Sequence, residues 1–324
     1  MSKLQEIKKM EMTKEECIEH KKMLFILNPR AGTMLASKYL VDILKEFEEG
    51  GYITTILLTR KPGDGRTFTM KYGKGMDVIA CAGGDGTLNE IIDGILSAGL
   101  KCDIGYIPAG STNDFANSVG IPKNIIHAAK NVATGIPTEL DIGSFNGRYF
   151  SYVASFGAFT SISYKVPQTL KNILGHTAYI LQGATDVLNI KQIHTKVYVD
   201  EGTDGEKIFE NDYIFGAICN SRSVGGIVTI KSDDVYMNDG KMEVILVTAP
   251  GNIVELHQLT RAILEGTMHS DCIKFVSAKT VRIELESSPN WTLDGEYEEG
   301  RVENNIATIK GGIRIILPKG TFLA

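Results

Sequence analysis

Short apolar runs alternate with amphipathic segments along the first 135 residues of the chain. The apolar runs cover residues 23–28 (MLFILN), 52–59 (YITTILLT), 77–84 (DVIACAGG) and 104–110 (IGYIPAG). Segments with helical spacing lie between them, and two of these end at glycines, Gly50 and Gly99. Such runs separated by helical patterns indicate buried strands joined by helices. The pattern therefore predicts an α/β fold with a doubly wound, parallel sheet, whose ligand site lies beyond the carboxyl ends of the strands.

The pattern changes after about residue 140. Asn146-Gly147 stands between two alternating runs, which is the strongest short signal for a hairpin. Further strand-like segments follow, and helical patterns interrupt them near 167–189 and 251–266. These features predict a second, mostly antiparallel and β-rich domain.

The two patterns define the expected domains. Residues 1–22 form a charged leader without the apolar stretch of a secretory signal. We expect an α/β domain at 23–140 and a β-rich domain at 141–305, with a C-terminal strand at about 306–324 that could return to the first domain. The junction between such domains is a favoured place for a substrate.

Composition narrows the function classes. The 324 residues carry a net charge of −5 without a basic stripe, which argues against a nucleic-acid partner. The five cysteines form no C-x-x-C pair, so neither a disulfide framework nor a zinc site is expected. No segment has the roughly 18 consecutive apolar residues of a membrane span. We therefore expect a cytoplasmic protein.

Three glycine-containing turns follow predicted strands: NPRAG (28–32), GGDGT (83–87) and PAGSTND (108–114). Glycine lets the backbone approach a phosphate closely, and the following helix offers unpaired N–H groups. Three such turns at one edge of a sheet would bind a nucleotide. For Thr87 and Thr112, each near a helix start, capping the helix is favoured over binding a phosphate oxygen.

Asp85 lies in the middle of the second turn. A carboxylate beside a phosphate requires a cation between them, and Mg²⁺ is the obvious candidate. The alternative is a tight turn in which Asp85 caps the helix that follows. The turn fits neither the P-loop nor the G-x-G-x-x-G pattern, so both interpretations stay open.

The turns and the late segment TLDGE (292–296) together resemble the diacylglycerol kinase catalytic-domain family, particularly its soluble bacterial members, which are related to sphingosine and ceramide kinases. The motifs extend from about residue 23 to near the end of the chain. GGDG alone is shared with NAD kinases and phosphofructokinases, whereas PAGSTNDFA combined with DGE is more specific. The resemblance implies ATP- and Mg²⁺-dependent phosphorylation of a lipid hydroxyl, giving phosphatidic acid from diacylglycerol.

The resemblance also implies roles for single residues. Glu296 would be the general base, with Asp294 beside it on the side of the γ-phosphate. Asp85 would organise Mg²⁺, although the matching aspartate is assigned as the base in the sphingosine kinase branch. Without the upstream motifs, DGE would suggest only a solvated acidic turn. The implied nucleotide contacts are Asn28, Pro29, Arg30, Ala31, Gly32, Thr59, Gly83, Gly84, Asp85, Gly86, Thr87, Leu88, Asn89, Glu90 and Thr112.

A second acidic turn resembles the family's structural Mg²⁺ site. Its ligands would be Asp239 and the main-chain oxygens of Tyr236 and Lys241. Asn-Asp-Gly is also ordinary hairpin composition, so an empty turn is the alternative. The single tryptophan, Trp291, is expected to pack in a strand rather than bind lipid.

The resemblance leaves several partners and functions open. A lipid substrate implies transient, peripheral contact with the inner membrane face, and the family suggests a homodimer. Residues 166–190 carry apolar and basic positions that suit a membrane surface, although a core-facing helix is favoured. An NAD kinase is the rival enzyme, and a nucleotide- or lipid-sensing protein without turnover is the non-enzymatic alternative.

Overall fold

The computed structural model describes residues 20–157, 191–221, 223–224, 228–230 and 235–321. The predicted leader at 1–22 lies almost wholly outside the described residues. The segment at 166–190, with its two alternative interpretations, lies wholly outside them.

The first half of the chain forms a parallel sheet from the predicted apolar runs. Its strands are β1 (Lys21–Leu27), β2 (Tyr52–Leu58), β3 (Val78–Gly83) and β4 (Asp103–Pro108). They pair in the order β4-β3-β1-β2. The strand order reverses between β1 and β3, and such a switch point is where doubly wound sheets bind ligands. The predicted α/β class is confirmed.

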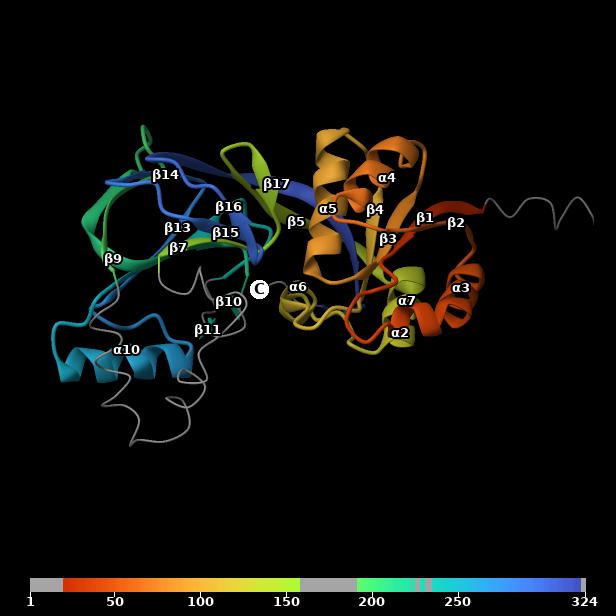
Figure 1. Cartoon of the computed structure of the whole chain (residues 1–324), viewed down its shortest axis with the longest axis horizontal. Coiled ribbons are helices and arrows are strands. Elements are labelled where there is room, and N and C mark those ends of the chain that lie inside the picture. The colour runs from red at the N-terminus through yellow and green to blue at the C-terminus, as the bar shows by residue number, and fades with distance from the viewer. Residues whose placement is uncertain (1–19, 158–190, 222, 225–227, 231–234, 322–324) are drawn as a thin grey trace, which may run out of the picture.

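Helices cover both faces of this sheet (Figure 1). On one face α4 (Asp64–Tyr72) packs on α5 (Asp85–Ser97), and on the other α3 (Leu40–Glu49) packs on α7 (Ile125–Thr134). Two short helices, α2 (Leu35–Lys38) and α6 (Asp114–Ser118), follow the first and third turns. The chain leaves α5 through Gly99, whose φ is +60°, as predicted for a glycine that ends a helix.

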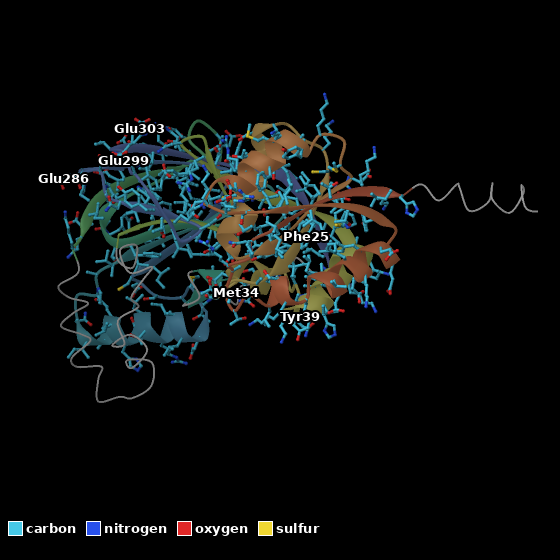
Figure 2. The ribbon with its side chains drawn as sticks, turned by 45° about the vertical axis from the view of Figure 1, so that its right-hand side comes forward. Phe25, Met34, Tyr39, Glu286, Glu299 and Glu303 are labelled. Carbon is cyan, nitrogen blue, oxygen red and sulfur yellow. The ribbon has the colours of Figure 1, made fainter. Side chains whose placement is uncertain are left out.

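The interior of this half is packed by aromatic and aliphatic side chains. Phe25 of β1 is fully buried, and its ring meets the ring of Phe47 edge to face with centroids 5.3 Å apart. Figure 2 shows Phe25 between the layers, whereas Met34 and Tyr39 lie at the lower surface. Burying one such ring stabilises the fold by roughly 1.5–3 kcal/mol.

The second half is antiparallel and rich in strands, as predicted. The hairpin signal at Asn146-Gly147 is confirmed, because both residues have positive φ and Phe145 pairs with Arg148 across the turn. The second predicted helix is α10 (Ile253–Glu265). The strands are β5 (Ile136–Phe145), β6 (Arg148–Phe150), β7 (Val153–Gly157), β8 (Ile193–Val199), β9 (Lys207–Cys219), β10 (Ser223–Val224), β11 (Val228–Thr229), β12 (Met242–Thr248), β13 (Ile273–Ala278), β14 (Thr280–Leu285), β15 (Trp291–Leu293), β16 (Glu296–Glu298) and β17 (Glu303–Leu317).

Trp291 is buried in the core of the second half. Its ring lies 4.6 Å from that of Phe145 and 4.8 Å from that of Phe156, centroid to centroid. The prediction that it packs a strand is confirmed, and the packing fixes β15 against β7. This strand leads into the predicted DGE turn.

The last strand joins the two halves. β17 pairs with β14 and β5 antiparallel, and at Ile315 it lies parallel to Ile104 of β4. The pairing with β5 shifts between Ile309 and Ile313, where two glycines interrupt the strand. One sheet therefore runs through both halves, and β15 and β16 come back toward α5 and α6 near the middle of the molecule (Figure 1).

Candidate active site

The three predicted turns meet at the carboxyl ends of β1, β3 and β4. A Cβ atom at Gly110 would lie 2.6 Å from Cα of Gly84, and one at Gly32 would lie 2.4 Å from the main-chain oxygen of Ala109. Gly32 also has a φ of +48°. Side chains at these positions would push the turns apart, so the bare backbone serves their mutual packing as well as any ligand.

Side chains tie the first turn to the second. Nδ2 of Asn28 donates to Oγ1 of Thr87 at 3.3 Å, and Oδ1 of Asn28 accepts from the N–H of Arg30 at 3.1 Å. The carbonyl of Pro29 accepts from Ser37, and Ala31 is buried beside it. The predicted capping role of Thr87 is wrong, because the N-cap position of α5 is Gly84 and no side chain caps that end.

Thr112 also does not cap a helix. The N-cap position of α6 is Asn113, and the main-chain oxygen of Thr112 accepts from Asn117 at 3.2 Å. The side chain of Thr112 is exposed above the third turn.

The other residues of the second turn and the start of α5 that were predicted to contact the nucleotide have different surroundings. Glu90 accepts from the N–H groups of Gly63 and Gly65 at 2.7 and 2.8 Å, and so orders the loop that follows β2. Leu88 is fully buried in the core. Asn89 is buried, and its Oδ1 has no hydrogen-bond partner in the described part of the chain. Gly83 packs on Thr87, since a Cβ there would lie 2.5 Å from that side chain.

The loop after β2 presents basic side chains beside the first turn. Thr59 is buried at the end of β2, and its N–H donates to Leu27 at 3.0 Å. Arg60 and Lys61, like Arg30 of the first turn, are exposed and make no ion pair among the described residues. Arg60 and Lys61 match no motif, and the only signal for them in the sequence is their position just after a predicted strand.

Asp85 begins α5 and is nearly buried. Its carboxylate accepts from the N–H of Asp114 at 3.0 Å, from that of Phe115 at 3.4 Å and from the hydroxyl of Tyr106 at 3.4 Å. The alternative that Asp85 caps its own helix is therefore wrong, because the carboxylate serves the start of α6. Burial raises the pKa of Asp85 to about 6, and the negative charges of Asp114 and Asp294 add to the shift, while the N–H donors oppose it.

The DGE segment is a two-residue hairpin turn between β15 and β16. Asp294 and Gly295 both have positive φ, and Leu293 pairs with Glu296 across the turn. Gly295 and Glu296 are exposed, as in the solvated acidic turn that composition alone suggested, but Asp294 departs from it because it is only 6% exposed. A turn of this kind favours the Asp-Gly pair for its backbone geometry.

The carboxylate of Asp294 is held by four donors from one short segment. Oδ2 accepts from the N–H and the hydroxyl of Ser151 at 2.6 and 2.8 Å, and Oδ1 accepts from the N–H groups of Tyr152 and Val153 at 2.9 and 3.0 Å. Burial raises the pKa of Asp294, and these hydrogen bonds counteract the shift. Asp294 thereby anchors the hairpin to the start of β7.

Glu296 faces the second glycine turn. A Cβ atom at Gly86 would lie 3.0 Å from Oε1 of Glu296. Oε2 of the same carboxylate accepts from Nη2 of Arg148 at 3.0 Å, and the other end of that guanidinium contacts Glu298. The structure therefore brings together two motifs that lie 210 residues apart in the chain.

Four carboxylates converge between the halves: those of Asp85, Asp114, Asp294 and Glu296. Burial raises the pKa of the Tyr152 hydroxyl, and all four negative charges add to the effect. Tyr152 has no signal in the sequence, whereas Asp114 belongs to the PAGSTND turn and could have been singled out there. Such an excess of negative charge attracts a cation.

The acidic cluster fits a divalent cation that keeps open ligand positions. Within the described residues, no three side chains of His, Cys, Asp or Glu form a metal centre by themselves. Mg²⁺ commonly binds one or two carboxylates and completes its shell with water and substrate phosphates. Asp85 and Asp114 are the two carboxylates of this cluster that belong to glycine turns.

The second predicted metal turn also has an unusual carboxylate beside it. Asp239 accepts from the N–H of Lys241 at 2.9 Å, and Tyr236 is 40% exposed. Glu243 is 1% exposed, and neither of its carboxylate oxygens has a partner in the described part of the chain. Burial raises the pKa of Glu243 to about 8, and the charges of Asp239 and Asp141 contribute. These oxygens suit a hard cation.

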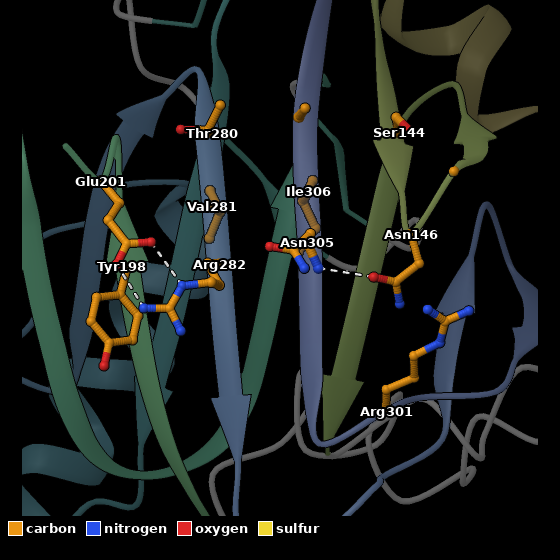
Figure 3. Close-up of a pocket in the computed structure, with 12 residues that line it drawn as sticks. Ser144, Asn146, Tyr198, Glu201, Thr280, Val281, Arg282, Arg301, Asn305 and Ile306 are labelled. Carbon is orange, nitrogen blue, oxygen red and sulfur yellow. Dashed lines mark hydrogen bonds and ion pairs between the residues drawn. The ribbon is translucent and has the colours of Figure 1, made fainter. Parts of the chain in front are cut away.

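A surface hollow of about 580 Å³ lies away from the glycine turns, over β5, β14 and β17 (Figure 3). In it the guanidinium of Arg282 stacks over Tyr198 at 3.7 Å and pairs with Glu201, while the N–H of Asn305 donates to Asn146. None of the predicted site residues lines this hollow. Because this hollow is separate from the glycine turns and from the acidic residues, we assign it no chemistry.

Helices long and apolar enough to span a membrane are absent from the described parts of the chain.

The comparison with protein families divides the chain into two matched parts. Residues 22–145 match the family model described as the diacylglycerol kinase catalytic domain. Residues 154–317 match the model described as the YegS C-terminal NAD kinase beta sandwich-like domain. The first match contains all three glycine turns, and the second contains Asp294 and Glu296.

Relatives with similar sequences cover nearly the whole chain. It is 31% identical to a diacylglycerol kinase of Bacillus subtilis strain 168 over 302 residues, which are 92% of this chain and 97% of the relative. It is 32% identical to a diacylglycerol kinase of Staphylococcus epidermidis over 309 residues, or 93% and 94% of the two chains. The crystal structure of a diacylglycerol kinase from Bacillus anthracis is similar in fold, with a TM-score of 0.74 at 21% identity and coverage of 94% and 99%.

Proposed function

The chain belongs to the diacylglycerol kinase family, and from this membership we propose that it transfers the γ-phosphoryl group of ATP to the free hydroxyl of diacylglycerol, with phosphatidic acid as the product. It is thus a kinase with an alcohol acceptor. The observation that carries the specific proposal is the approach of the Glu296 carboxylate to Gly86 of the second glycine turn.

ATP binds, in this proposal, over the three turns at the switch point of the sheet. The turns offer main-chain N–H groups that no side chain caps at the start of α5, and such groups bind phosphate oxygens. The side chain of Thr112 is exposed, and the exposed side chains of Arg30 and Lys61 form no ion pair among the described residues. Long basic side chains beside the turns would balance the charge of a triphosphate.

Mg²⁺ is the proposed companion of the nucleotide, and Asp85 is its proposed protein ligand. When bound, the ion would neutralise charge on the phosphates and on the carboxylate cluster of Asp85, Asp114 and Asp294. Asp85 is held in place for this by the N–H of Asp114, at 3.0 Å. With a pKa of about 6, its carboxylate is largely ionised at neutral pH.

Glu296 acts as the general base. As the lipid hydroxyl attacks, its proton passes to Oε1 of Glu296, its oxygen bonds to the γ-phosphorus, and the bond from that phosphorus to the bridging β–γ oxygen breaks, so that ADP leaves. A positioned base contributes typically about 10²–10⁴-fold to a rate, and positioning and charge stabilisation supply the rest. Asp294 makes no such transfer in this proposal, because its oxygens are already occupied by four donors.

The wider organisation follows from the same assignment. We assign nucleotide binding to residues 23–140 with β17 beside β4, and lipid binding to residues 141–305. The lipid would be reached by peripheral, transient contact with the inner membrane face, because diacylglycerol resides in a bilayer. A second Mg²⁺ at Asp239 would stabilise the turn next to the unpartnered Glu243 carboxylate.

An NAD kinase is the second candidate, since the family model matched by the C-terminal half is described as NAD kinase beta sandwich-like. One assay separates the candidates: the protein is incubated with γ-labelled ATP, Mg²⁺ and either diacylglycerol in mixed micelles or NAD. We expect label in phosphatidic acid. Label in NADP would favour the NAD kinase, and binding of ATP without transfer to either acceptor would favour a sensor.

A further inference from the structure

We propose that Arg148 is a positioning residue, which holds Glu296 so that Oε1, and not Oε2, faces the reacting hydroxyl. This inference rests on the proposed role of Glu296 as the base. The two oxygens of that carboxylate have different surroundings: Oε2 accepts from Arg148 at 3.0 Å, whereas Oε1 lies 3.0 Å from the place where a Cβ of residue 86 would be.

Arg148 contacts two residues of the β15–β16 hairpin at once. It begins β6, directly after the Asn146-Gly147 turn, and pairs with Phe145. One Nη atom donates to Glu296 and the other to Glu298. Glu296 and Glu298 are two positions apart on β16, so their side chains leave the same face of the strand. A single planar guanidinium can therefore fix both.

Without this contact, Glu296 would have no defined position. Its side chain is 52% exposed, and its ion pairs among the described residues involve Arg148 alone. A glutamate on an exposed strand has three rotatable side-chain bonds and samples several rotamers. Because a displacement of about 1 Å in a reacting group can lower a rate by roughly 10²-fold, fixing one rotamer has a direct effect on turnover.

Residues 151–153, which follow Arg148 closely in the chain, anchor the turn of the β15–β16 hairpin. Ser151, Tyr152 and Val153 hold the buried Asp294 carboxylate, and this anchor does not involve Arg148. The backbone of the β15–β16 hairpin is therefore fixed independently of the guanidinium. Replacement of Arg148 should release the side chain of Glu296 without unfolding the hairpin.

A double-mutant cycle in turnover tests the proposal. We would measure kcat, the KM for ATP and the thermal midpoint for the wild type, Arg148→Ala, Arg148→Lys, Glu296→Gln and the double variant. We expect Arg148→Ala to lower kcat by roughly 10- to 100-fold, with the KM for ATP changed less than about twofold and the thermal midpoint nearly unchanged. Arg148→Lys should restore part of the loss, because lysine keeps the charge but contacts one acid at a time.

The decisive arm is the double variant. If Arg148 acts only through Glu296, adding Arg148→Ala to Glu296→Gln should lower kcat by less than about twofold further. A further loss as large as that in the wild-type background would overturn the proposal, since Arg148 would then act on its own, for example on a phosphate. A matched control is Arg314→Ala, which removes a guanidinium that pairs with Asp103 at 2.8 Å near the opposite end of the sheet.

The two proposals fail differently. If Glu296→Gln is inactive while Arg148→Ala turns over at the wild-type rate, the positioning role is wrong and the base assignment stands. If Glu296→Gln itself keeps the wild-type rate, the base assignment fails, and the positioning role fails with it.

Discussion

Oε1 of Glu296 lies 3.0 Å from the point that a Cβ of residue 86 would occupy, although the two residues come from opposite halves of the chain. Gly86 stands in the first turn of α5, and Glu296 begins β16. The missing side chain at position 86 is what allows the carboxylate to approach the glycine turn. The glycines at 84 and 110 have another reason, because they touch backbone to backbone.

Gly86→Ala should separate stability from activity. Alanine is favoured over glycine inside a helix by about 1 kcal/mol, so the thermal midpoint should stay equal or rise. The new methyl group would crowd Oε1 of Glu296 and displace it, so kcat should fall by roughly 10-fold or more. In a Glu296→Gln background the same change should have little further effect. Wild-type turnover by Gly86→Ala would contradict the proposed approach of the carboxylate.

The proposed role of Asp85 predicts that kcat/KM falls on the acid side of the pH profile. Its pKa is raised to about 6, so the carboxylate is ionised at neutral pH and becomes protonated as the pH falls through that value. Protonation removes the charge that would bind Mg²⁺, and kcat/KM for the metal–nucleotide complex should therefore fall below about pH 6. We would measure kcat/KM between pH 5 and pH 8, and a value that does not change over this range would count against the role of Asp85. The Asp85→Asn variant should have low activity throughout.

Glu243 should make the metal-free protein less stable in alkali. Its folded pKa is raised from 4.5 to about 8, so the folded state retains a proton that the unfolded state has lost, and stability declines as the pH rises from about 4.5 through 8. In EDTA at pH 8, Glu243→Gln should raise the free energy of unfolding by about 1–3 kcal/mol, whereas at pH 5 the two proteins should be nearly equal. Urea unfolding measures both.

The opposite outcome is informative for the second metal turn. If Glu243→Gln is less stable than the wild type at pH 8 in EDTA, the carboxylate has a partner other than a cation. Adding Mg²⁺ should stabilise the wild type more than the variant, because the ion would balance the buried charge beside Asp239.

Asp294 is expected to be a structural anchor. Removing its carboxylate leaves the N–H groups of Ser151, Tyr152 and Val153 buried without an acceptor, so Asp294→Ala should lower the free energy of unfolding by about 3 kcal/mol or more. Ser151→Ala removes only one of the four donors and should cost about 1 kcal/mol. Chemical denaturation distinguishes the two. A loss below 0.5 kcal/mol for Asp294→Ala would mean that the anchor is not needed.

Local patterns in the sequence were sufficient for the elements of the first half. The apolar run at 23–28 became β1, at Lys21–Leu27, because a fully buried parallel strand needs little else than such a run. Gly99 and Asn146-Gly147 marked a helix end and a hairpin, since positive φ restricts the residues that can stand there. The fold class follows from these signals.

The wrong predictions were those in which a distant partner decides. Asp85 and Thr87 looked like caps of their own helix, but Asp85 accepts from Asp114, 29 residues later, and Thr87 accepts from Asn28. Arg148 had no local signal, because its partner Glu296 lies 148 residues away and is reached only through the pairing of antiparallel strands. A hydrophobic pattern indicates that a strand exists and leaves its neighbour in the sheet undefined.

The most direct test of the account is the transfer of labelled phosphate from ATP to diacylglycerol by Glu296→Gln, with Glu299→Gln as the matched control. Glu299 is an exposed acid three positions further along the chain. Figure 2 labels it at the upper left of the second half. We predict that Glu296→Gln loses at least 10²-fold in kcat while ATP affinity stays within about twofold, and that Glu299→Gln resembles the wild type. Near-wild-type formation of phosphatidic acid by Glu296→Gln would contradict the account.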